Sequence, residues 1–184
     1  MNTKIVTTTP FGPVVLVWSD ANGSPEIFRV LLSRPGSPAP AQAAELFPGA
    51  RQASCRKIDA IAASIREFLA GHDIVFPLDV AALATRPAFQ QAVLRAEHAI
   101  PRGRVSTYGL IARHLSDRNA ARAVGNALAT NPFPLIVPCH RAVRSDGGLG
   151  GFQGGPAMKR ALLEREGIDF DQAGRVVVPR FYYS

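Results

Sequence analysis

The stretch "VSTYGLIARHLSDRNAARAVGNALATNP", residues 105–132, decides the fold of the second half of the chain. Apolar residues recur at helical spacing behind Thr107, which is suited to cap a helix, and "SDRN" interrupts them. A second helix is expected from about Asn119. The positions expected to face inward are Leu110, Ile111 and Leu115 in the first helix and Val124, Ala127 and Leu128 in the second. Two short helices around a tight break predict a helix-turn-helix.

The second of these helices carries small residues on its outer face, with Arg122 alone among them. The small residues are Ala120, Ala121, Gly125 and Ala129. Glycine in a helix costs ~1 kcal/mol relative to alanine, so its presence indicates that another backbone approaches closely. A nucleic-acid backbone and a second protein helix both fit this pattern. A long cation on a smooth surface is also suited to enter a narrow groove.

Positive charge is concentrated in the second half of the chain. Residues 1–84 hold seven Lys or Arg and seven Asp or Glu, whereas residues 85–184 hold fourteen and seven, so the net charge of +7 lies there. Seven arginines and a single acid lie between residues 101 and 144. Such a bias favours a polyanionic partner, nucleic acid above all, over a merely solvated basic face.

The flanking segments predict an α+β protein with two domains. Residues 5–33 read as two or three strands with a turn at "DANGS", and a helix with Ile61, Ile65, Phe68 and Leu69 inward stops at Gly71. We interpret residues 34–42 as a surface loop and residues 75–87 as a link. A helix over residues 87–100 is expected to turn Phe89, Val93, Leu94 and Ala96 inward. We therefore predict a small α/β domain, residues 1–84, and a mainly helical domain, residues 85–184.

Composition narrows the class of protein. With 184 residues and 47% hydrophobic content, the chain has enough apolar surface for an ordinary core. Cys55 and Cys139 form no CxxC pair and the histidines show no HxxxH spacing, so neither a zinc site nor a disulfide framework is expected. The first twenty residues fit neither a signal peptide nor a membrane span. We expect a cytoplasmic monomer with no metal, cofactor or membrane partner.

Cys139 and His140 stand side by side in "NPFPLIVPCHRAVRSDG", residues 131–147. A cysteine after an apolar run is more often a buried, inert thiol than a nucleophile. Two prolines nevertheless favour a turn here, and the amide of Asn131 is suited to hold it from the side. We therefore expect Cys139 to be exposed at a bend. A histidine within reach, directly or through one water, would take its proton.

The residues after this turn predict a flexible glycine loop and then a helix, with Pro156 in its first turn and Gly167 after its end. The loop lacks the GK[ST] that a phosphate-binding loop requires. An acid behind His140 would fix the tautomer of the imidazole. Glu164 and Glu166 are both candidates, and the residues alone do not choose between them.

The segment "RAVGNALATNPFPLIVPCHRAVRSDGGLGGFQGGPAMKRALLEREG", residues 122–167, resembles the active-site region of the O6-alkylguanine-DNA alkyltransferases. Five elements of that family occur in order: an arginine-bearing recognition helix, Asn-Pro, Pro-Cys-His-Arg, a glycine loop, and a helix ending in Glu-Gly. The resemblance extends with weaker matches to about residues 85–167. It implies a ribonuclease H-like amino-terminal domain and a winged-helix, helix-turn-helix carboxy-terminal domain.

The resemblance implies a single-turnover DNA repair reaction. Cys139 would take the alkyl group from O6 of a damaged guanine and keep it as a thioether. His140 would act as base through water with Glu166 orienting it, Asn131 would hold the cysteine turn, and Tyr108 would donate to the departing guanine.

The implied partner is double-stranded DNA containing O6-alkylguanine, with the damaged base rotated out of the stack. Arg122 would enter from the minor groove and fill the vacated place, while Ala121 and Gly125 would let the helix approach. The other implied DNA contacts are Gln90, Gly109 and Ser145. The implied base pocket comprises Leu128, Ala142, Val143, Phe152, Gln153 and Gly154, with carbonyls of Cys139 and Ala142 accepting from the guanine amine.

Three positions depart from the family's usual residues: Ala142 where valine is common, and Gly109 and Ala129 where longer side chains are often found. These changes put the fit of the pocket and the DNA affinity in question. Two other functions remain open. A non-catalytic lesion sensor of the same family would lack the cysteine, and a cysteine hydrolase would leave the arginines unexplained.

Overall fold

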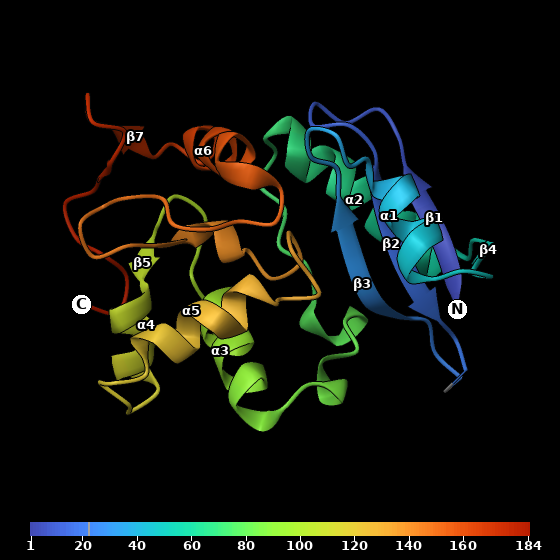
Figure 1. Cartoon of the computed structure of the whole chain (residues 1–184), viewed down its shortest axis with the longest axis horizontal. Coiled ribbons are helices and arrows are strands. Elements are labelled where there is room, and N and C mark those ends of the chain that lie inside the picture. Colours follow the sequence, from blue (N-terminus) through green and yellow to red (C-terminus); the bar gives the residue numbers. More distant parts are fainter. Residues whose placement is uncertain (22) are drawn as a thin grey trace. The chain divides into compact units, whose positions relative to one another are not determined.

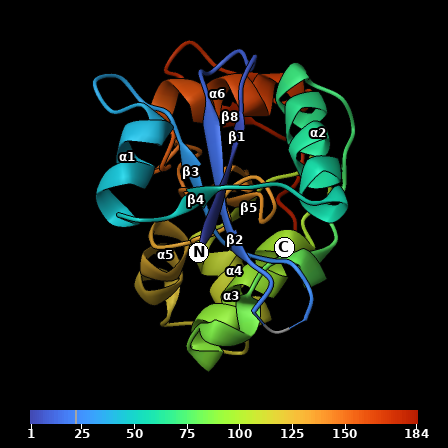
Figure 2. The same cartoon turned by 90° about the vertical axis from the view of Figure 1, so that its right-hand side faces the viewer.

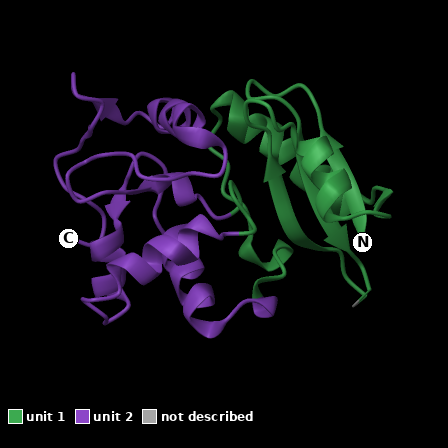
Figure 3. Cartoon of the chain, viewed as in Figure 1, with its two compact units in different colours: residues 1–83, 132–136 green, residues 84–131, 137–184 purple. Residues whose placement is uncertain are grey.

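The computed structural model describes residues 1–21 and 23–184. They divide into two compact units, residues 1–83 with 132–136 and residues 84–131 with 137–184 (Figure 3). Both contain helices and short strands, so the predicted α+β class is confirmed. None of the helices in the described part of the chain is both long and apolar enough to span a membrane.

The first unit is built on a four-stranded sheet of order β3-β2-β1-β4. The strands are β1 (Asn2–Val6), β2 (Val14–Ser19), β3 (Glu26–Leu32) and β4 (Arg51–Gln52). β2 runs antiparallel to β1 and β3, with Val14 paired to Val6 and to Leu32. Figure 2 shows α1 (Ala39–Leu46) and α2 (Arg56–Ala70) on opposite sides of this sheet. Burial of both faces explains why β2 is apolar at five consecutive positions rather than alternating.

The sequence prediction for this unit holds in part. Three strands are present in the predicted region, and α2 ends at Gly71, whose φ of 107° is the left-handed conformation that glycine favours. The predicted surface loop at 34–42 is wrong for residues 39–42, which begin α1. Pro40 lies in the first turn of this helix, where its fixed φ suits helix initiation. The predicted turn "DANGS" includes Asn22, which lies outside the described residues.

The second unit carries most of the helices. Its elements are α3 (Ala88–His98), β5 (Ser106–Thr107), α4 (Tyr108–His114), α5 (Ala121–Ala129), the 3₁₀ turn η3 (Cys139–Arg141), β6 (Ala142–Val143), α6 (Gly155–Arg165), β7 (Asp169–Phe170) and β8 (Val176–Val177). α3, α4 and α5 contact one another (Figure 1). The short 3₁₀ turns η1 (Leu78–Val80) and η2 (Leu83–Thr85) occupy the predicted link.

The helix pair predicted from residues 105–132 is present as α4 and α5. The Thr107 side chain caps α4 by accepting from the Leu110 N–H at 3.2 Å. The predicted inward residues are buried except Leu115, which is half-buried. The inward placement of Phe89 is wrong, because this residue lies in the first turn of α3 and is 42% exposed, whereas Val93 and Leu94 further along are fully buried.

A two-residue parallel ladder joins distant parts of the second unit. β5 pairs with β6, with Ser106 opposite Ala142 and Thr107 opposite Val143. β5 leads directly into α4, and η3 leads directly into β6. Val105, Val143 and Leu163 pack in one buried apolar cluster around this ladder. The start of α4 and the Cys139 turn are therefore held in a fixed register.

Candidate active site

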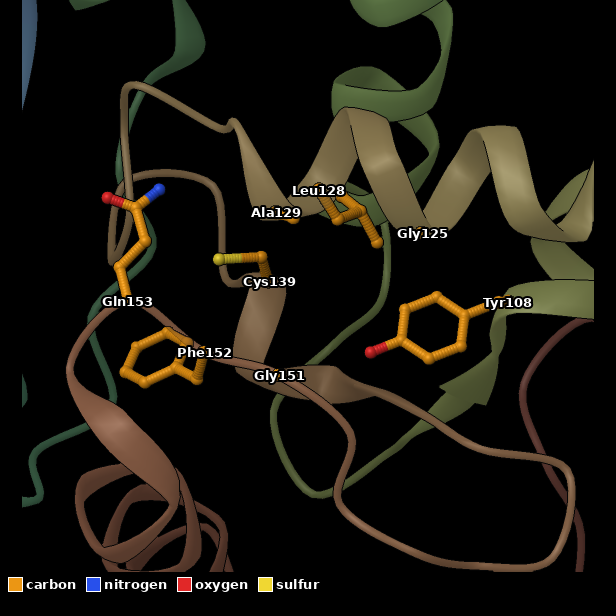
Figure 4. Close-up of a pocket in the computed structure, with 8 residues that line it drawn as sticks. All are labelled: Tyr108, Gly125, Leu128, Ala129, Cys139, Gly151, Phe152 and Gln153. Carbon is orange, nitrogen blue, oxygen red and sulfur yellow. The ribbon is translucent and has the colours of Figure 1, made fainter.

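A pocket of about 240 Å³ opens in the second unit where α4, α5, η3 and the glycine loop meet (Figure 4). The residues that line it are Tyr108, Gly125, Leu128, Ala129, Cys139, Gly151, Phe152 and Gln153. Figure 4 shows the Tyr108 hydroxyl directed into the pocket from one side and the Phe152 ring on the other, with Cys139 between them. The pocket therefore presents one thiol and one phenol to whatever occupies it.

The register of the β5–β6 ladder sets the positions of Cys139 and Tyr108. Tyr108 is the first residue after β5, and Cys139 lies three residues before β6. Gly150 then limits the position of the phenol, because a Cβ atom built on Gly150 would lie 2.5 Å from the Tyr108 hydroxyl oxygen. A side chain at this position would push the phenol from its place. The φ of Gly150, 68°, is also one that other residues rarely adopt.

The predicted bend at Cys139 is a 3₁₀ turn. The Asn131 amide Nδ2 donates to the Val137 carbonyl at 3.2 Å, and the Arg141 N–H donates to the Pro138 carbonyl at 2.8 Å. The predicted exposure of Cys139 is wrong, since the residue is only 5% exposed. The whole segment from residue 131 to residue 143 is buried, so the bend turns the thiol into the interior and toward the pocket.

Burial raises the pKa of the Cys139 thiol to about 11, even though an interaction with Asn131 lowers it in part. At neutral pH only about one molecule in 10⁴ then carries the thiolate at rest. The thiolate is the reactive form of cysteine. Any reaction of Cys139 in the pocket must therefore remove its proton as the reaction proceeds.

A buried network behind Cys139 joins His140, Arg141 and Glu166. The His140 Nε2 lies 2.9 Å from Glu166 Oε1, and Arg141 donates to both carboxylate oxygens at 2.8 and 2.9 Å. Arg141 also donates to the Ile100 carbonyl at 2.6 Å. The structure thus decides which of the two candidate acids, Glu164 and Glu166, lies behind His140: it is Glu166. Glu164 is on the surface of α6 and pairs with Arg160 instead.

The network fixes the protonation states of its members. Burial alone would raise the pKa of Glu166, but the hydrogen bonds and charges of His140 and Arg141 outweigh it and lower the pKa to about 2. Burial lowers the pKa of His140, against the opposing effect of Glu166. At neutral pH His140 is therefore neutral, with its proton assigned to Nε2, which donates to the Glu166 carboxylate. Its Nδ1 then carries the lone pair that accepts a proton.

Two further buried titratable residues, Lys159 and Glu97, were not identified from the sequence. Both are fully buried. Lys159 Nζ donates to the Ala142 carbonyl at 2.6 Å and to the Gly151 carbonyl at 3.2 Å, so it joins β6 to the glycine loop. The helical period contained a signal, because Glu97 continues the inward stripe of α3 after Val93 and Leu94.

The residues for which the family resemblance implies DNA contacts lie mostly on the surface of the second unit. Arg122 and Ser145 are exposed, and Gly109, Ala121 and Gly125 are half-buried. Gln90 differs from these. Its amide Nε2 donates to the Ala127 carbonyl and to the Thr130 hydroxyl, both at 3.1 Å. The Gln90 side chain therefore holds the end of α5.

The residues that the family resemblance implies for the base pocket fall into two groups. Leu128, Phe152 and Gln153 line the pocket, whereas Ala142, Val143 and Gly154 are not among the described residues that do. Val143 is in β6 and turns its side chain into the buried cluster with Leu163. The Ala142 carbonyl accepts from Lys159. Gly154 caps the start of α6, where a Cβ would collide with Met158 and Phe152. Gln153 also donates to the Asn131 carbonyl.

Metal ligands do not cluster in the described part of the chain: no three His, Cys, Asp or Glu side chains come together as ligands would. The chemistry available in the pocket is that of a thiol, a neutral imidazole backed by a carboxylate, and a phenol. Burial raises the pKa of Tyr108 to about 12, so this phenol keeps its proton and is able to donate it.

Comparison with known proteins identifies relatives. Residues 88–168 match the family described as 6-O-methylguanine DNA methyltransferase, DNA binding domain. A methylated-DNA--protein-cysteine methyltransferase of Methanothermobacter thermautotrophicus is 43% identical over 59% of this chain and 60% of its own length. A protein of the same name from Haemophilus influenzae is 44% identical over 52% of this chain and 54% of its own length. The matches thus span little more than half of these curated relatives.

Solved structures are similar over a longer region. The crystal structure of Mycobacterium tuberculosis OGT in complex with DNA is 32% identical, covers 90% of this chain and 92% of its own, and has a TM-score of 0.68. An O6-methylguanine-DNA methyltransferase from Pyrococcus kodakaraensis, 22% identical with a TM-score of 0.68, has a similar fold.

Proposed function

This chain belongs to the 6-O-methylguanine DNA methyltransferase family, and on that premise we propose that it repairs double-stranded DNA by moving an alkyl group from O6 of guanine to Cys139. The observation that carries the proposal is the position of Cys139: it lines a pocket, and it shares its 3₁₀ turn with His140, which is hydrogen-bonded to the buried Glu166 carboxylate. Residues 85–184 carry DNA binding and transfer. We assign a winged helix-turn-helix to this part and a ribonuclease H-like fold to the amino-terminal part.

The transfer is a displacement at the alkyl carbon. The Cys139 sulfur forms a bond to that carbon as the bond from carbon to O6 breaks, and the electron pair of that bond stays on guanine. The thiol proton leaves toward His140, through one water, and guanine takes a proton in return. The products are a thioether and an unmodified guanine. Because no step removes the alkyl group from sulfur, each protein molecule reacts once.

The buried network supplies the base for this step. A thiol with a pKa of about 11 needs a proton acceptor during the reaction, and neutral His140 has one at Nδ1. The Glu166 carboxylate stays ionised and stabilises the imidazolium as it forms. This arrangement follows the same logic as other cysteine–histidine–acid sites. Tyr108 donates to the guanine ring as negative charge develops there.

Base extrusion brings the lesion to the pocket. A base inside a stacked duplex is out of reach of a buried thiol, and rotating it out costs a few kcal/mol. We propose that α4 and α5 form a helix-turn-helix that binds the minor groove. The small surface of Ala121 and Gly125 allows close approach, and exposed Arg122 fills the place of the extruded base.

Intact-protein mass spectrometry tests the proposal. The protein is incubated with a duplex oligonucleotide containing O6-methylguanine and then digested and mapped. We expect one added methyl group per protein, located on Cys139, and no addition to a Cys139→Ala variant. Folded protein that gains no methyl group would refute transfer, and repeated turnover of substrate would favour a hydrolase.

The role of Arg122 is tested by comparing two substrates. We expect Arg122→Ala to slow repair of the duplex lesion at least tenfold while its reaction with free O6-benzylguanine stays within about twofold, since only the duplex requires base extrusion. Arg118→Ala is the matched control, because it removes another exposed arginine from the turn before α5. Equal slowing on both substrates would rule out this role for Arg122.

A further inference from the structure

Glu97 is a buried carboxyl group that the proposed reaction does not use. It is 0% exposed, and neither of its oxygens has a well-aligned hydrogen-bond donor among the described residues. Buried carboxylates are normally hydrogen-bonded or paired with a cation. A carboxyl group in this environment either keeps its proton or requires a positive charge nearby.

Lys159 is the complementary group on α6. Its ammonium is also 0% exposed, and it has three donors, of which two are used by the Ala142 and Gly151 carbonyls. Glu97 and Lys159 meet at the same peptide: the Ala142 N–H lies close enough to Glu97 to lower the pKa of its carboxyl slightly, and the Ala142 carbonyl accepts from Lys159. Ala142 directly follows the Cys139 turn.

We propose that Glu97 and Lys159 form a buried acid–base pair beside the Cys139 turn, and that the net charge of this pair sets the reactivity of the Cys139 thiol. The inference rests on the proposed function for its biological meaning, since it names positioning residues for that transfer. The reactivity of the Cys139 thiol itself is measured without DNA.

The opposing charges act on the thiol in opposite directions. Negative charge on Glu97 raises the pKa of Cys139, and positive charge on Lys159 lowers it. Burial, the largest influence on both, raises the pKa of Glu97 to about 8 and lowers that of Lys159 to about 8. The net charge of the pair therefore becomes more negative as the pH rises through 8. Thiolate formation is then opposed in the pH range where it would otherwise increase.

Other charged groups around Glu97 are already engaged or remain neutral. Arg141 of η3 is held by Glu166 and the Ile100 carbonyl, and Tyr183 donates to the Ala96 carbonyl. Tyr108 and Tyr183 both have a pKa of about 12 and stay protonated. The titratable and charged groups near Glu97 on the elements packed against α3 are Lys159, Arg141, Cys139, Tyr108 and Tyr183. Of these, Lys159 is the group that changes its charge in the same pH range as Glu97.

The test measures the rate at which iodoacetamide alkylates Cys139 between pH 6 and 11. Iodoacetamide reports the thiolate directly: the sulfur–carbon bond forms as iodide leaves. A full-length Cys55→Ser chain serves as the background, so that the second cysteine does not contribute. We expect Glu97→Gln to raise the rate about tenfold above pH 8, where the wild-type carboxylate is charged, and Lys159→Met to lower it by a similar factor below pH 8, where the wild-type ammonium is charged.

Controls separate a charge effect from damage to the fold. Glu164→Gln makes the same chemical change on an exposed part of α6 and is expected to leave the profile unchanged. Circular dichroism verifies folding, and Glu97→Gln decides the question alone if Lys159→Met does not fold. An unchanged rate above pH 8 in Glu97→Gln, or rate changes of the same sign in both variants, would overturn the inference. Repair of O6-methylguanine measured in the same preparations tests the proposed function separately.

Discussion

Replacing Glu166 by glutamine should destabilise the second unit strongly and in a pH-dependent manner. The carboxylate accepts three hydrogen bonds, one from His140 and two from Arg141, and all three residues are buried. A neutral amide offers one acceptor oxygen and puts an N–H donor where the second oxygen accepts from Arg141 Nε, so it cannot accept all three hydrogen bonds. Removal of one member of a buried ion pair typically costs about 3–5 kcal/mol.

The pKa of Glu166 gives a second estimate of the same effect. The pKa falls from 4.5 to about 2, and at about 1.4 kcal/mol per pH unit this corresponds to roughly 3 kcal/mol. Because the pKa of this acid is lowered in the folded state, the stabilisation is fully present above about pH 4.5 and is lost as the pH falls toward 2. The wild-type advantage over Glu166→Gln should therefore shrink between pH 5 and pH 2.

Urea unfolding followed by circular dichroism at pH 7 and pH 3 measures this difference in the free energy of unfolding. In thermal unfolding at pH 7, the Tm of Glu166→Gln should be lower than that of the wild type by roughly 10 °C. Glu164→Gln is the matched control, because its surface pair with Arg160 is worth about 0–1 kcal/mol at any pH. A loss below 1 kcal/mol in Glu166→Gln, or a loss of equal size at both pH values, would show that the buried carboxylate does not hold this network.

Two further substitutions test how the pocket is assembled. Gly150→Ala places a Cβ atom 2.5 Å from the Tyr108 hydroxyl and should slow alkyl transfer at least tenfold in a single-turnover assay. Gly155→Ala is the control, because Gly155 has a similar positive φ but open space around it. This control should reduce stability by about 1–2 kcal/mol without slowing transfer. Thr107→Ala removes the cap of α4 and should cost about 1 kcal/mol in urea unfolding, while Thr107→Ser should retain most of it; equal losses in the two variants would argue against the cap.

Local features of the fold and the buried faces of its helices could be predicted from the sequence, whereas the burial of the Cys139 turn could not. Helical spacing and a capping threonine identify α4 and α5 because both are determined within a few residues. Prolines around Cys139 likewise indicate a turn. The exposure predicted for Cys139 is wrong because burial depends on the segments that pack around the turn, and these come from positions far away in the sequence. The same applies to residues 39–42, where the prolines suggested a loop but one of them starts a helix.

The choice of the acid behind His140 shows the same limit. Glu164 and Glu166 are two residues apart, and each is a reasonable carboxylate at the end of one helix. Only the tertiary structure brings Glu166, which caps the end of α6, against His140 and Arg141. Glu97 illustrates the opposite case. The inward stripe of α3 includes its position, but a charged residue in such a stripe is easily assigned to the surface because buried carboxylates are rare.

Burial of Cys139 also suits a protein that reacts once. A thiol with a pKa of about 11 has about a hundredfold less thiolate at pH 7 than one with the ordinary value of 9.0. Small electrophiles in solution therefore find little reactive sulfur, whereas a base held in the pocket remains beside the thiol long enough for His140 to take the proton. The proposed transfer thus requires iodoacetamide to modify Cys139 at pH 7 at least tenfold more slowly than it modifies glutathione. A rate equal to that of glutathione would mean that the thiol is neither protected nor dependent on its network, and the argument from burial to selective repair would fail.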